Sequence, residues 1–347
     1  MTEKYKVLFL TERSPRHQQA ALASAPPELA VVMLRQPPRA EILHHLPDAE
    51  FLITERAHTL DAALIQAGKK LRLIQRLGSL TFDIDVTAAK QAGIPVCYWP
   101  IRGCILVAEH MVMQMLALVK RLPEVNAVAN AAADWGRPSQ HTDENTFAYN
   151  WSKRTGIDGI DGKTVGIWGF GEIGAELARR LSGFCPAQIL YNKRRQLPAS
   201  VEAALGLTYA TQEQLLIQSD FVCCLLPFYP ETELSLNAAS FAQMKKGALL
   251  VHCGSGSVID EAALAEAIQS GQLAGAALDT YEWEPIKQDN PLLALARNPQ
   301  MNVLLTPHTA AGAAATSATP KPSNRSQDYT NIARLLAGES LLYQVSG

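Results

Sequence analysis

The fold is decided by the stretch TVGIWGFGEIG, which runs from Thr164 to Gly174. Its apolar run, Val165 to Trp168, has the composition of a buried β-strand and stops at a glycine. Helical spacing of apolar residues begins at once with Ile173 and continues at Leu177 and Leu181. The stretch therefore predicts a strand, a tight turn and a helix.

The turn carries glycines in the pattern G-x-G-x-x-G, at Gly169, Gly171 and Gly174. Gly169 permits the sharp turn, Gly171 leaves room for a pyrophosphate against the backbone, and Gly174 lets helix and strand pack closely. The phosphates would meet the free N–H groups and the positive end of the helix dipole. A second strand, Gln188 to Tyr191, ends about 20 residues further on, where the ribose is recognised. This context predicts a dinucleotide-binding site.

The composition of the 347-residue chain, 48% hydrophobic and 18% charged, is typical of a soluble globular protein. Its length predicts two domains. The net charge of −2 gives no reason to expect nucleic acid or a membrane surface as a partner. The six cysteines show neither a C-x-x-C nor a metal-ligand spacing, and no signal peptide is visible, so we expect a cytoplasmic protein with reduced thiols and no metal.

Strand-like runs alternate with helical segments over residues 1 to 100, and the alternation resumes at Lys163. Such repeated βα units predict an α/β protein with two doubly wound parallel sheets, each covered by helices. The predicted strands are Val7–Leu10, Ala30–Leu34, Phe51–Thr54, Leu71–Arg76 and Pro95–Tyr98 in the first part, and Val165–Trp168, Gln188–Tyr191, Phe221–Leu226, Ala248–His252, Ala274–Leu278 and Asn302–Leu305 in the second.

Three segments lie between the two series of βα units. Trp99–Gly103 breaks the pattern and is predicted to be a hinge. Leu106–Arg121 is apolar on nearly every face, which predicts a helix buried between domains or subunits. Residues 134–162 lack periodicity, and so long a loop is either functional or a surface arm. Its aromatic residues are Phe147, Tyr149 and Trp151.

Asn192 follows the second nucleotide-domain strand at the position that selects the cofactor. An Asp or Glu there hydrogen-bonds the ribose 2′-hydroxyl of NAD and repels a 2′-phosphate. This chain instead has Asn192 followed by Lys193, Arg194 and Arg195, and a neutral residue with three cations suits a 2′-phosphate. A solvated basic turn is the alternative interpretation. The sequence favours NADP over NAD.

Several short stretches stand in a characteristic order along the chain. They are Val107–His110, Gly162–Gly166, Leu226-Pro227 with Pro230–Thr232, Met244–Ala248, Asp260–Leu264, Ala277–Asp279 with Glu284-Pro285, and Thr306–His308. In this order and spacing they make the chain resemble the D-isomer-specific 2-hydroxyacid dehydrogenase family over nearly its whole length. The resemblance implies a Rossmann nucleotide domain, residues 106–306, inserted into a flavodoxin-like substrate domain of residues 1–105 and 307–347. It also implies a homodimer built on the interdomain helix.

By the same resemblance, His308 corresponds to the acid/base that exchanges a proton with the substrate oxygen while hydride moves to or from nicotinamide. Glu284 corresponds to the carboxylate that orients His308, with Glu282 and Asp279 as nearby alternatives. A histidine suits this role because hydride transfer to a carbonyl develops an alkoxide. The predicted cofactor contacts are Gly169, Gly171, Glu172, Ile173, Gly174, Asn192, Lys193, Arg194, Arg195, Leu226, Pro227, Thr232, Cys253, Gly254, Asp279 and His308.

Three departures from the family pattern converge on the substrate pocket. Ser255 stands where the family's N-x-A-R-G motif carries the Arg that grips the substrate carboxylate; this chain reads His252-Cys253-Gly254-Ser255-Gly256. A serine brings no charge and cannot form a two-pronged bond to a carboxylate. The family's G-x-G, whose amides receive that carboxylate, appears as Gly78-Ser79-Leu80, and an Asn usual before the interdomain helix appears as Gly103.

Two interpretations follow. In the first, the enzyme moves hydride between NADPH and a small 2-oxo or 2-hydroxy acid or a related carbonyl compound. Arg102 or Arg76 would then bind the substrate in place of the missing Arg. Tyr149 and Trp151 would line the substrate pocket or belong to an arm that packs around a second subunit. In the second, the protein is a nucleotide sensor, like the corepressors of this fold, or catalyses another reaction with bound nucleotide. The retained acid/base pair argues against a pure sensor.

Overall fold

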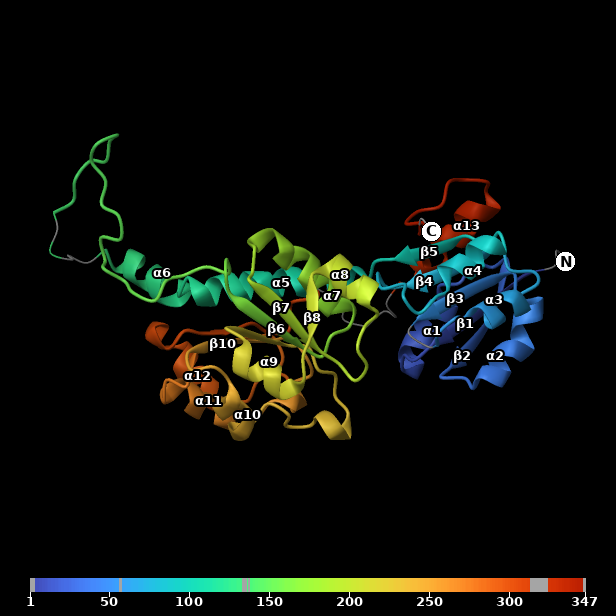
Figure 1. Cartoon of the computed structure of the whole chain (residues 1–347). Helices are drawn as coiled ribbons and strands as arrows, with labels where there is room; N and C mark the ends of the chain where they lie inside the picture. Colours follow the sequence, from blue (N-terminus) through green and yellow to red (C-terminus); the bar gives the residue numbers. More distant parts are fainter. Residues whose placement is uncertain (1–3, 56–57, 133–135, 137, 313–323, 346–347) are drawn as a thin grey trace. The chain divides into compact units, whose positions relative to one another are not determined.

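The computed structural model describes residues 4–55, 58–132, 136, 138–312 and 324–345. The chain forms two compact units: Met1–Ile101 with Ala314–Gly347 is unit 1, and Arg102–Ala313 is unit 2. Each unit is built on one parallel sheet, as the predicted α/β class requires (Figure 1). The unit boundaries differ from the predicted junctions at 105/106 and 306/307, so both Arg102 and His308 belong to unit 2.

Unit 1 has a five-stranded sheet in the order β2-β1-β3-β4-β5, and neighbouring strands are parallel. This is the flavodoxin-like order 2-1-3-4-5. Its elements are β1 (Tyr5–Thr11), α1 (Pro15–Ala23), β2 (Leu29–Arg35), α2 (Arg39–His45), η1 (Leu46–Asp48), β3 (Phe51–Glu55), α3 (Ala62–Ala67), β4 (Leu73–Leu77), α4 (Val86–Gln91), β5 (Val96–Trp99) and, near the C-terminus, η6 (Ser326–Tyr329) and α13 (Thr330–Leu336).

The sheet of unit 1 is buried on both faces. Successive side chains of a strand point to opposite faces, and along β1 both Phe9 and Leu10 are fully buried. Phe9 packs in a cluster that includes Ile332 of α13, whereas Leu10 belongs to the cluster on the other face. The hydroxyl of Tyr329 donates to the carbonyl of Ala21 at 2.9 Å. The C-terminal helix thus completes the core of unit 1.

Unit 2 has a seven-stranded parallel sheet in the order β12-β11-β10-β9-β6-β7-β8. This is the Rossmann order, 3-2-1-4-5-6, extended by one outer strand. The prediction of six strands is wrong by one, because β8 (Leu207–Tyr209) is too short to show a period. The other elements after the helices that open the unit are β6 (Thr164–Trp168), α7 (Glu172–Leu181), η2 (Ser182–Phe184), β7 (Gln188–Asn192), α8 (Ala199–Leu205), α9 (Gln212–Gln218), β9 (Phe221–Cys224), η3 (Pro230–Thr232), α10 (Ala238–Gln243), β10 (Ala248–His252), η4 (Gly256–Val258), α11 (Glu261–Gln269), β11 (Leu273–Leu278), α12 (Pro291–Ala296), η5 (Pro299–Met301) and β12 (Val303–Leu305).

Two helices, α5 (Arg102–Val119) and α6 (Leu122–Ala131), open unit 2. The predicted hinge Trp99–Gly103 is therefore wrong at three residues, because Trp99 ends β5 and the last two residues already belong to α5. Among the described residues, α5 is the one helix long and apolar enough to cross a membrane by composition, and half of that stretch is buried inside the protein. A buried core helix has the same composition, and α5 packs on the sheet, with Met115 Sδ 3.8 Å from Cys223 Sγ.

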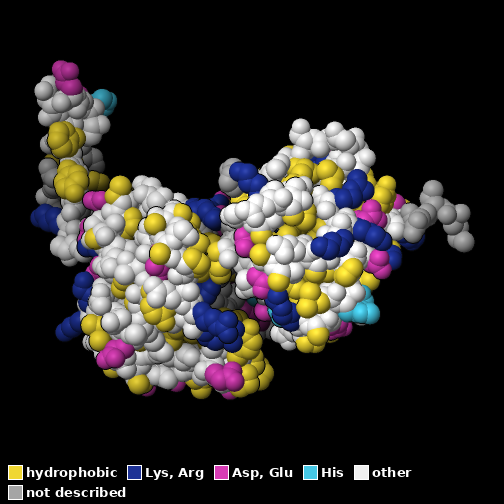
Figure 2. All heavy atoms as spheres, turned by 45° about the vertical axis from the view of Figure 1, so that its right-hand side comes forward, with side chains coloured by type: hydrophobic (Ala, Val, Ile, Leu, Met, Phe, Trp, Pro, Cys, Tyr) yellow, Lys and Arg dark blue, Asp and Glu magenta, His cyan; other side chains and the backbone are white. Residues whose placement is uncertain are grey.

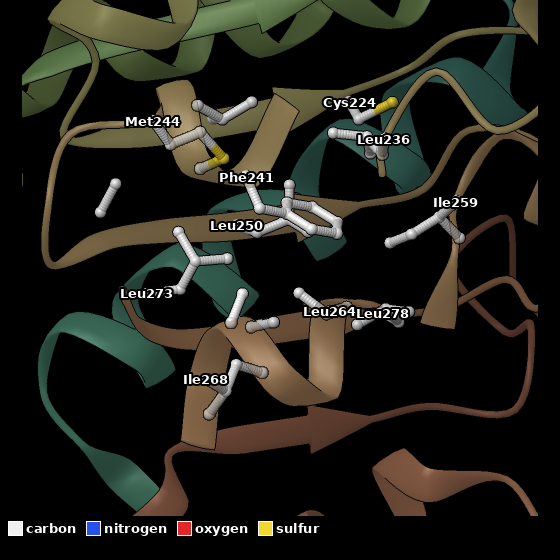
Figure 3. Packing of buried hydrophobic residues seen from close by; sticks show 14 of the residues in the cluster. Cys224, Leu236, Phe241, Met244, Leu250, Ile259, Leu264, Ile268, Leu273 and Leu278 are labelled. Atoms are coloured by element: carbon white, nitrogen blue, oxygen red, sulfur yellow. The ribbon is translucent and has the colours of Figure 1, made fainter. Parts of the chain in front are cut away.

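The opposite face of this sheet also carries a hydrophobic core. Cys224 follows Cys223 along β9 and points to this face, where Leu250 of β10, Phe241 of α10 and Leu264 of α11 meet (Figure 3). Phe241 is 1% exposed, and truncating such a buried aromatic ring costs about 3–5 kcal/mol. This core holds the strand ends that carry the candidate site.

Residues 138–163 form the irregular segment that the sequence predicts as loop 134–162; residues 134, 135 and 137 lie outside the described residues. The end of the segment is held to the first helices of unit 2: Arg154 pairs with Glu124 at 3.0 Å, and Asp158 N–H donates to the Val119 carbonyl at 3.0 Å. Hydrophobic side chains lie exposed along the segment (Figure 2). The exposed fractions are 75% for Phe147, 86% for Tyr149 and 39% for Trp151.

Candidate active site

The residues that the sequence singles out in unit 2 follow the carboxyl ends of its strands. In a parallel sheet these ends meet at one edge, where ligands bind. Strand β6 lies between β7 and β9, which is the point where the strand order reverses. The edge is built from the glycine turn after β6, Lys193–Arg195 after β7, Leu226-Pro227 after β9, Cys253–Ser255 after β10, Asp279 after β11 and His308 after β12.

The glycine turn is shaped for a group that approaches the backbone closely. Gly169 has a φ of +92°, and a Cβ there would lie 2.6 Å from the backbone nitrogen of Leu226. Helix α7 begins directly after the turn, with Gly171 as its extended N-cap. The N–H groups of a helix's first turn point out of its start, where they can meet a bound anion. A helix start lined by glycines fits a pyrophosphate.

The loops after β9 and β10 are joined beside this turn. A Cβ on Gly254 would lie 2.7 Å from the carbonyl oxygen of Leu226. The same carbonyl accepts a 2.8 Å hydrogen bond from the backbone N–H of Ser255. In the β9 loop, the Thr232 hydroxyl donates to the Pro227 carbonyl at 2.7 Å. These bonds fix the backbone on the side of the turn that faces β10.

At the end of β10, His252 is fully buried, and the next residue, Cys253, is half-buried. Burial raises the pKa of the Cys253 thiol well above its ordinary value, and the thiol donates to Gln114 Oε1 at 3.4 Å. Burial also lowers the pKa of His252 to about 4, with the nearby Ser255 backbone offsetting only part of the effect. Cys253 is therefore a protonated thiol and His252 a neutral imidazole at neutral pH.

The ribose side of the turn carries exposed cations. Asn192 donates its side-chain N–H to the Ala210 carbonyl at 2.8 Å, while Arg194 and Arg195 are exposed. The guanidinium carbon of Arg194 lies 5.5 Å from the centre of the Tyr229 ring. Tyr229 belongs to the loop after β9, and the sequence analysis missed it because an aromatic residue in a loop gives no signal by itself.

His308 and Glu284 are brought together across 24 residues of sequence. Nδ1 of His308 lies 2.7 Å from Oε2 of Glu284, and their side chains are 57% and 36% exposed. The other Glu284 oxygen accepts the backbone N–H of Tyr281 at 3.1 Å. His308 has a φ of +51°, a left-handed conformation that is uncommon outside glycine and typical of functional positions. The carboxylate thus fixes one ring nitrogen and leaves Nε2 for a ligand.

Asp279 anchors the backbone around His308. Its two carboxylate oxygens accept the N–H groups of Thr309 and Ala310 at 3.0 and 2.9 Å and the hydroxyl of Thr306 at 2.6 Å. Nε2 of His110 lies 3.0 Å from the same hydroxyl, which already donates to Asp279, so His110 is the donor in that contact. Burial lowers the pKa of His110, and the charge of Asp279 opposes this.

The remaining predicted substrate residues have other surroundings. In unit 1, Nε of Arg76 donates to both carboxylate oxygens of Asp83 at 3.1 and 2.9 Å, and the side chain is buried, so it serves the fold of that unit. Gly78 donates its N–H to the Trp99 carbonyl at 2.8 Å, and Leu80 is 6% exposed. Arg102 is exposed in the first turn of α5. Ser79 is half-buried in unit 1, and Tyr149 and Trp151 are exposed on segment 138–163 of unit 2.

The chain is similar to known proteins. The family description "D-isomer specific 2-hydroxyacid dehydrogenase, NAD binding domain" matches residues 112–310. The D-3-phosphoglycerate dehydrogenase of Archaeoglobus fulgidus is 34% identical over 275 residues, which are 79% of this chain and 47% of the relative. The D-3-phosphoglycerate dehydrogenase of Mycobacterium leprae is 30% identical, over 85% of this chain and 52% of its own. The chain thus spans about half the length of the curated relatives it matches.

One solved structure is similar along the whole chain. A glyoxylate reductase from Paecilomyes thermophila is 26% identical with a TM-score of 0.51, and 99% of each chain is covered. The family match covers more than half of the chain and includes the glycine turn, Glu284 and His308. The chain belongs to the D-isomer-specific 2-hydroxyacid dehydrogenase family.

Proposed function

We propose that this protein transfers hydride between NADP(H) and the carbonyl carbon of a 2-oxo acid or a related carbonyl compound. The observation that carries the proposal is the 2.7 Å bond between His308 Nδ1 and Glu284 Oε2, in the same unit as the glycine turn. A protein that only senses a nucleotide needs no such pair. The similar glyoxylate reductase, named for a 2-oxo acid, supports the same class of substrate.

His308 handles the proton in this reaction. Because a carboxylate only accepts hydrogen bonds, Nδ1 of His308 carries its hydrogen toward Glu284, and Nε2 faces the reacting oxygen. In the reduction, Nε2–H of the imidazolium protonates the oxygen as the carbonyl becomes an alcohol; in the oxidation, the neutral Nε2 takes that proton back. When bound, nicotinamide supplies or accepts the hydride. Asp279 accepts backbone N–H groups just after His308 and so fixes the backbone that carries the imidazole ring.

NADP(H) is the proposed cofactor because the turn after β7 carries no carboxylate. A carboxylate at position 192 would repel a 2′-phosphate, and Asn192 does not. Lys193, Arg194 and Arg195 add three cations, the last two exposed. We expect the double variant Arg194→Ala/Arg195→Ala to weaken NADPH binding far more than NADH binding. Equal losses for the two nucleotides would assign the turn a structural role only.

The function is tested by following oxidation of NADPH, and separately of NADH, across 2-oxo acids, aldehydes and ketones. His308→Ala should lower kcat about a hundredfold or more, the usual contribution of a general acid. His44→Ala, which removes an exposed histidine of unit 1, is the matched control. Tight nucleotide binding without turnover of any carbonyl would replace this proposal with the nucleotide sensor.

The proposed assembly is a homodimer that uses segment 138–163. Its support is the exposure of Phe147 and Tyr149 on a segment whose end is fixed by Arg154. Large aromatic side chains are enriched at interfaces. The wild type should sediment as a dimer and Phe147→Ser/Tyr149→Ser as a monomer, whereas Tyr343→Ser, at an exposed tyrosine of unit 1, should leave the mass unchanged. A monomeric wild type would exclude this assembly.

A further inference from the structure

An apolar cavity of about 430 Å³ opens beside the catalytic pair in unit 2. Ile286, Leu293 of α12 and Leu305 of β12 form its apolar walls, and Glu284 and His308 line it as well. Ligand pockets of proteins have volumes of about 300–1,000 Å³. The cavity is therefore large enough for a small organic group and shares a wall with the residues that exchange the proton.

The walls of this cavity belong to packed elements of unit 2. Ile286 and Leu305 are partly buried and pack against the core cluster of unit 2 that contains Phe241. Leu293 comes from α12, whose Leu292 and Leu295 are buried in that core. Because the walls rest on packed elements, the cavity does not have to be opened by a ligand, and a bound group meets preformed apolar surface.

His308 connects the cavity with the proposed proton exchange, because its side chain lines the cavity. Its Nδ1 is taken by Glu284, so a substrate oxygen that exchanges a proton must approach Nε2. The His308 side chain is 57% exposed and lines the cavity. A substrate held at this ring can therefore place the substituent of its carbonyl carbon against Leu293 and Leu305.

The chemistry of the lining selects what that substituent can be. No Lys or Arg lines the cavity among the described residues, and Glu284 puts a carboxylate on its wall. A second anion on the substituent would be repelled there, whereas an alkyl or aryl group would lose water contact. Ser255, in the loop after β10, is uncharged and offers a carboxylate no two-pronged bond.

We propose that this cavity receives an apolar substituent of the substrate, a branched alkyl or aryl group on the carbonyl carbon. The inference rests on the proposed function and adds to it the class of substrate. Small or doubly charged 2-oxo acids are then poor substrates, and carbonyl compounds with a larger apolar group are good ones.

A binding experiment tests the cavity without turnover. Primary amides from acetamide to octanamide, unreactive carbonyl analogues, are titrated into the protein saturated with NADPH. We expect the affinity to rise about three- to fourfold for each methylene that is buried, until the cavity is full. An affinity independent of chain length would overturn the proposal.

Two variants of neighbouring residues on α12 locate the effect. Leu293→Trp narrows the cavity and should reduce the gain in affinity with chain length, whereas Ala294→Trp places the same indole ring at an exposed residue that does not line it. Leu293→Ala enlarges the cavity and should move the optimum to longer amides; it serves if the tryptophan variant does not fold. Equal slopes for Leu293→Trp and Ala294→Trp would overturn the proposal.

Steady-state kinetics separates the inference from the function on which it rests. The ratio of kcat/KM for a long-chain to that for a short-chain 2-oxo acid should be high in the wild type and fall in Leu293→Trp. Turnover with no preference for the apolar substituent would overturn the cavity and leave the hydride-transfer function standing. Amide binding that depends on Leu293, without turnover of any carbonyl, would keep the cavity and overturn the function.

Discussion

The carboxylate of Asp279 accepts a 2.6 Å hydrogen bond from the hydroxyl of Thr306, two residues before His308. The same carboxylate accepts the N–H groups of Thr309 and Ala310, just after that histidine. One buried side chain thus holds the backbone on both sides of His308. The left-handed φ of His308 is kept by these contacts rather than by its own preference.

Asp279→Asn should therefore affect catalysis through the position of His308. An amide offers one oxygen where the carboxylate offers two, so one of the three donors loses its partner. We expect kcat to fall by about ten- to a hundredfold, the usual effect of misplacing a catalytic group by about 1 Å. KM should change little. Stopped-flow measurement of NADPH oxidation at saturating substrate checks this.

A helix cap provides the control for this variant. Asp260 caps α11 by accepting the Ala263 N–H at 2.9 Å, and Asp260→Ala should cost about 1 kcal/mol of stability. If kcat falls as much in Asp260→Ala as in Asp279→Asn, the loss reflects stability alone, and Asp279 has no positioning role.

The contact between Arg194 and Tyr229 predicts a second effect, on cofactor choice. Tyr229→Ala removes the ring that lies 5.5 Å from the guanidinium, and exposed cation–π contacts contribute about 0.5–1 kcal/mol. We expect NADPH to bind about two- to fivefold more weakly, with NADH nearly unaffected, in a fluorescence titration. Phe228→Ala, at the exposed neighbouring residue, is the control. Equal weakening of both nucleotides by Tyr229→Ala would argue against the contact.

Structural features that depend on a local sequence pattern could be predicted. The glycine turn, the βα alternation and the pairing of His308 with Glu284 follow from motifs whose spacing is set within one strand–loop unit or by resemblance. Strand β8 could not be predicted because its three residues are too few to show a period, and the start of α5 at Arg102 could not be predicted because Pro100 interrupts the apolar pattern just before it. Neither Tyr229 beside Arg194 nor Asp83 beside Arg76 could be predicted, because side-chain partners across loops depend on packing.

Gly169→Ala tests the close approach of the glycine turn to the β9 loop. The new methyl group would lie 2.6 Å from the Leu226 nitrogen, and the residue would keep a φ of +92°. We expect loss of nucleotide binding and a destabilisation of about 1–3 kcal/mol. Gly247→Ala is the matched control, because its φ is +80° and no atom lies within 4 Å of the added Cβ. It should share the strain but keep nucleotide binding; weaker binding in both variants would contradict the close-approach argument.

His252 predicts how the stability of the protein changes with acid. Burial lowers its pKa from 6.5 to about 4 in the folded protein. Above pH 6.5 both states are neutral, and below it only the unfolded state takes up the proton, so stability is lost as the pH falls from about 6.5 to about 4. Between pH 7 and 5 this one group should lower the free energy of unfolding by about 2 kcal/mol. In urea titrations at both pH values, His252→Leu should show a difference smaller by that amount, whereas His44→Leu, at an exposed histidine, should match the wild type. A difference unchanged in His252→Leu would mean that other groups carry the acid sensitivity.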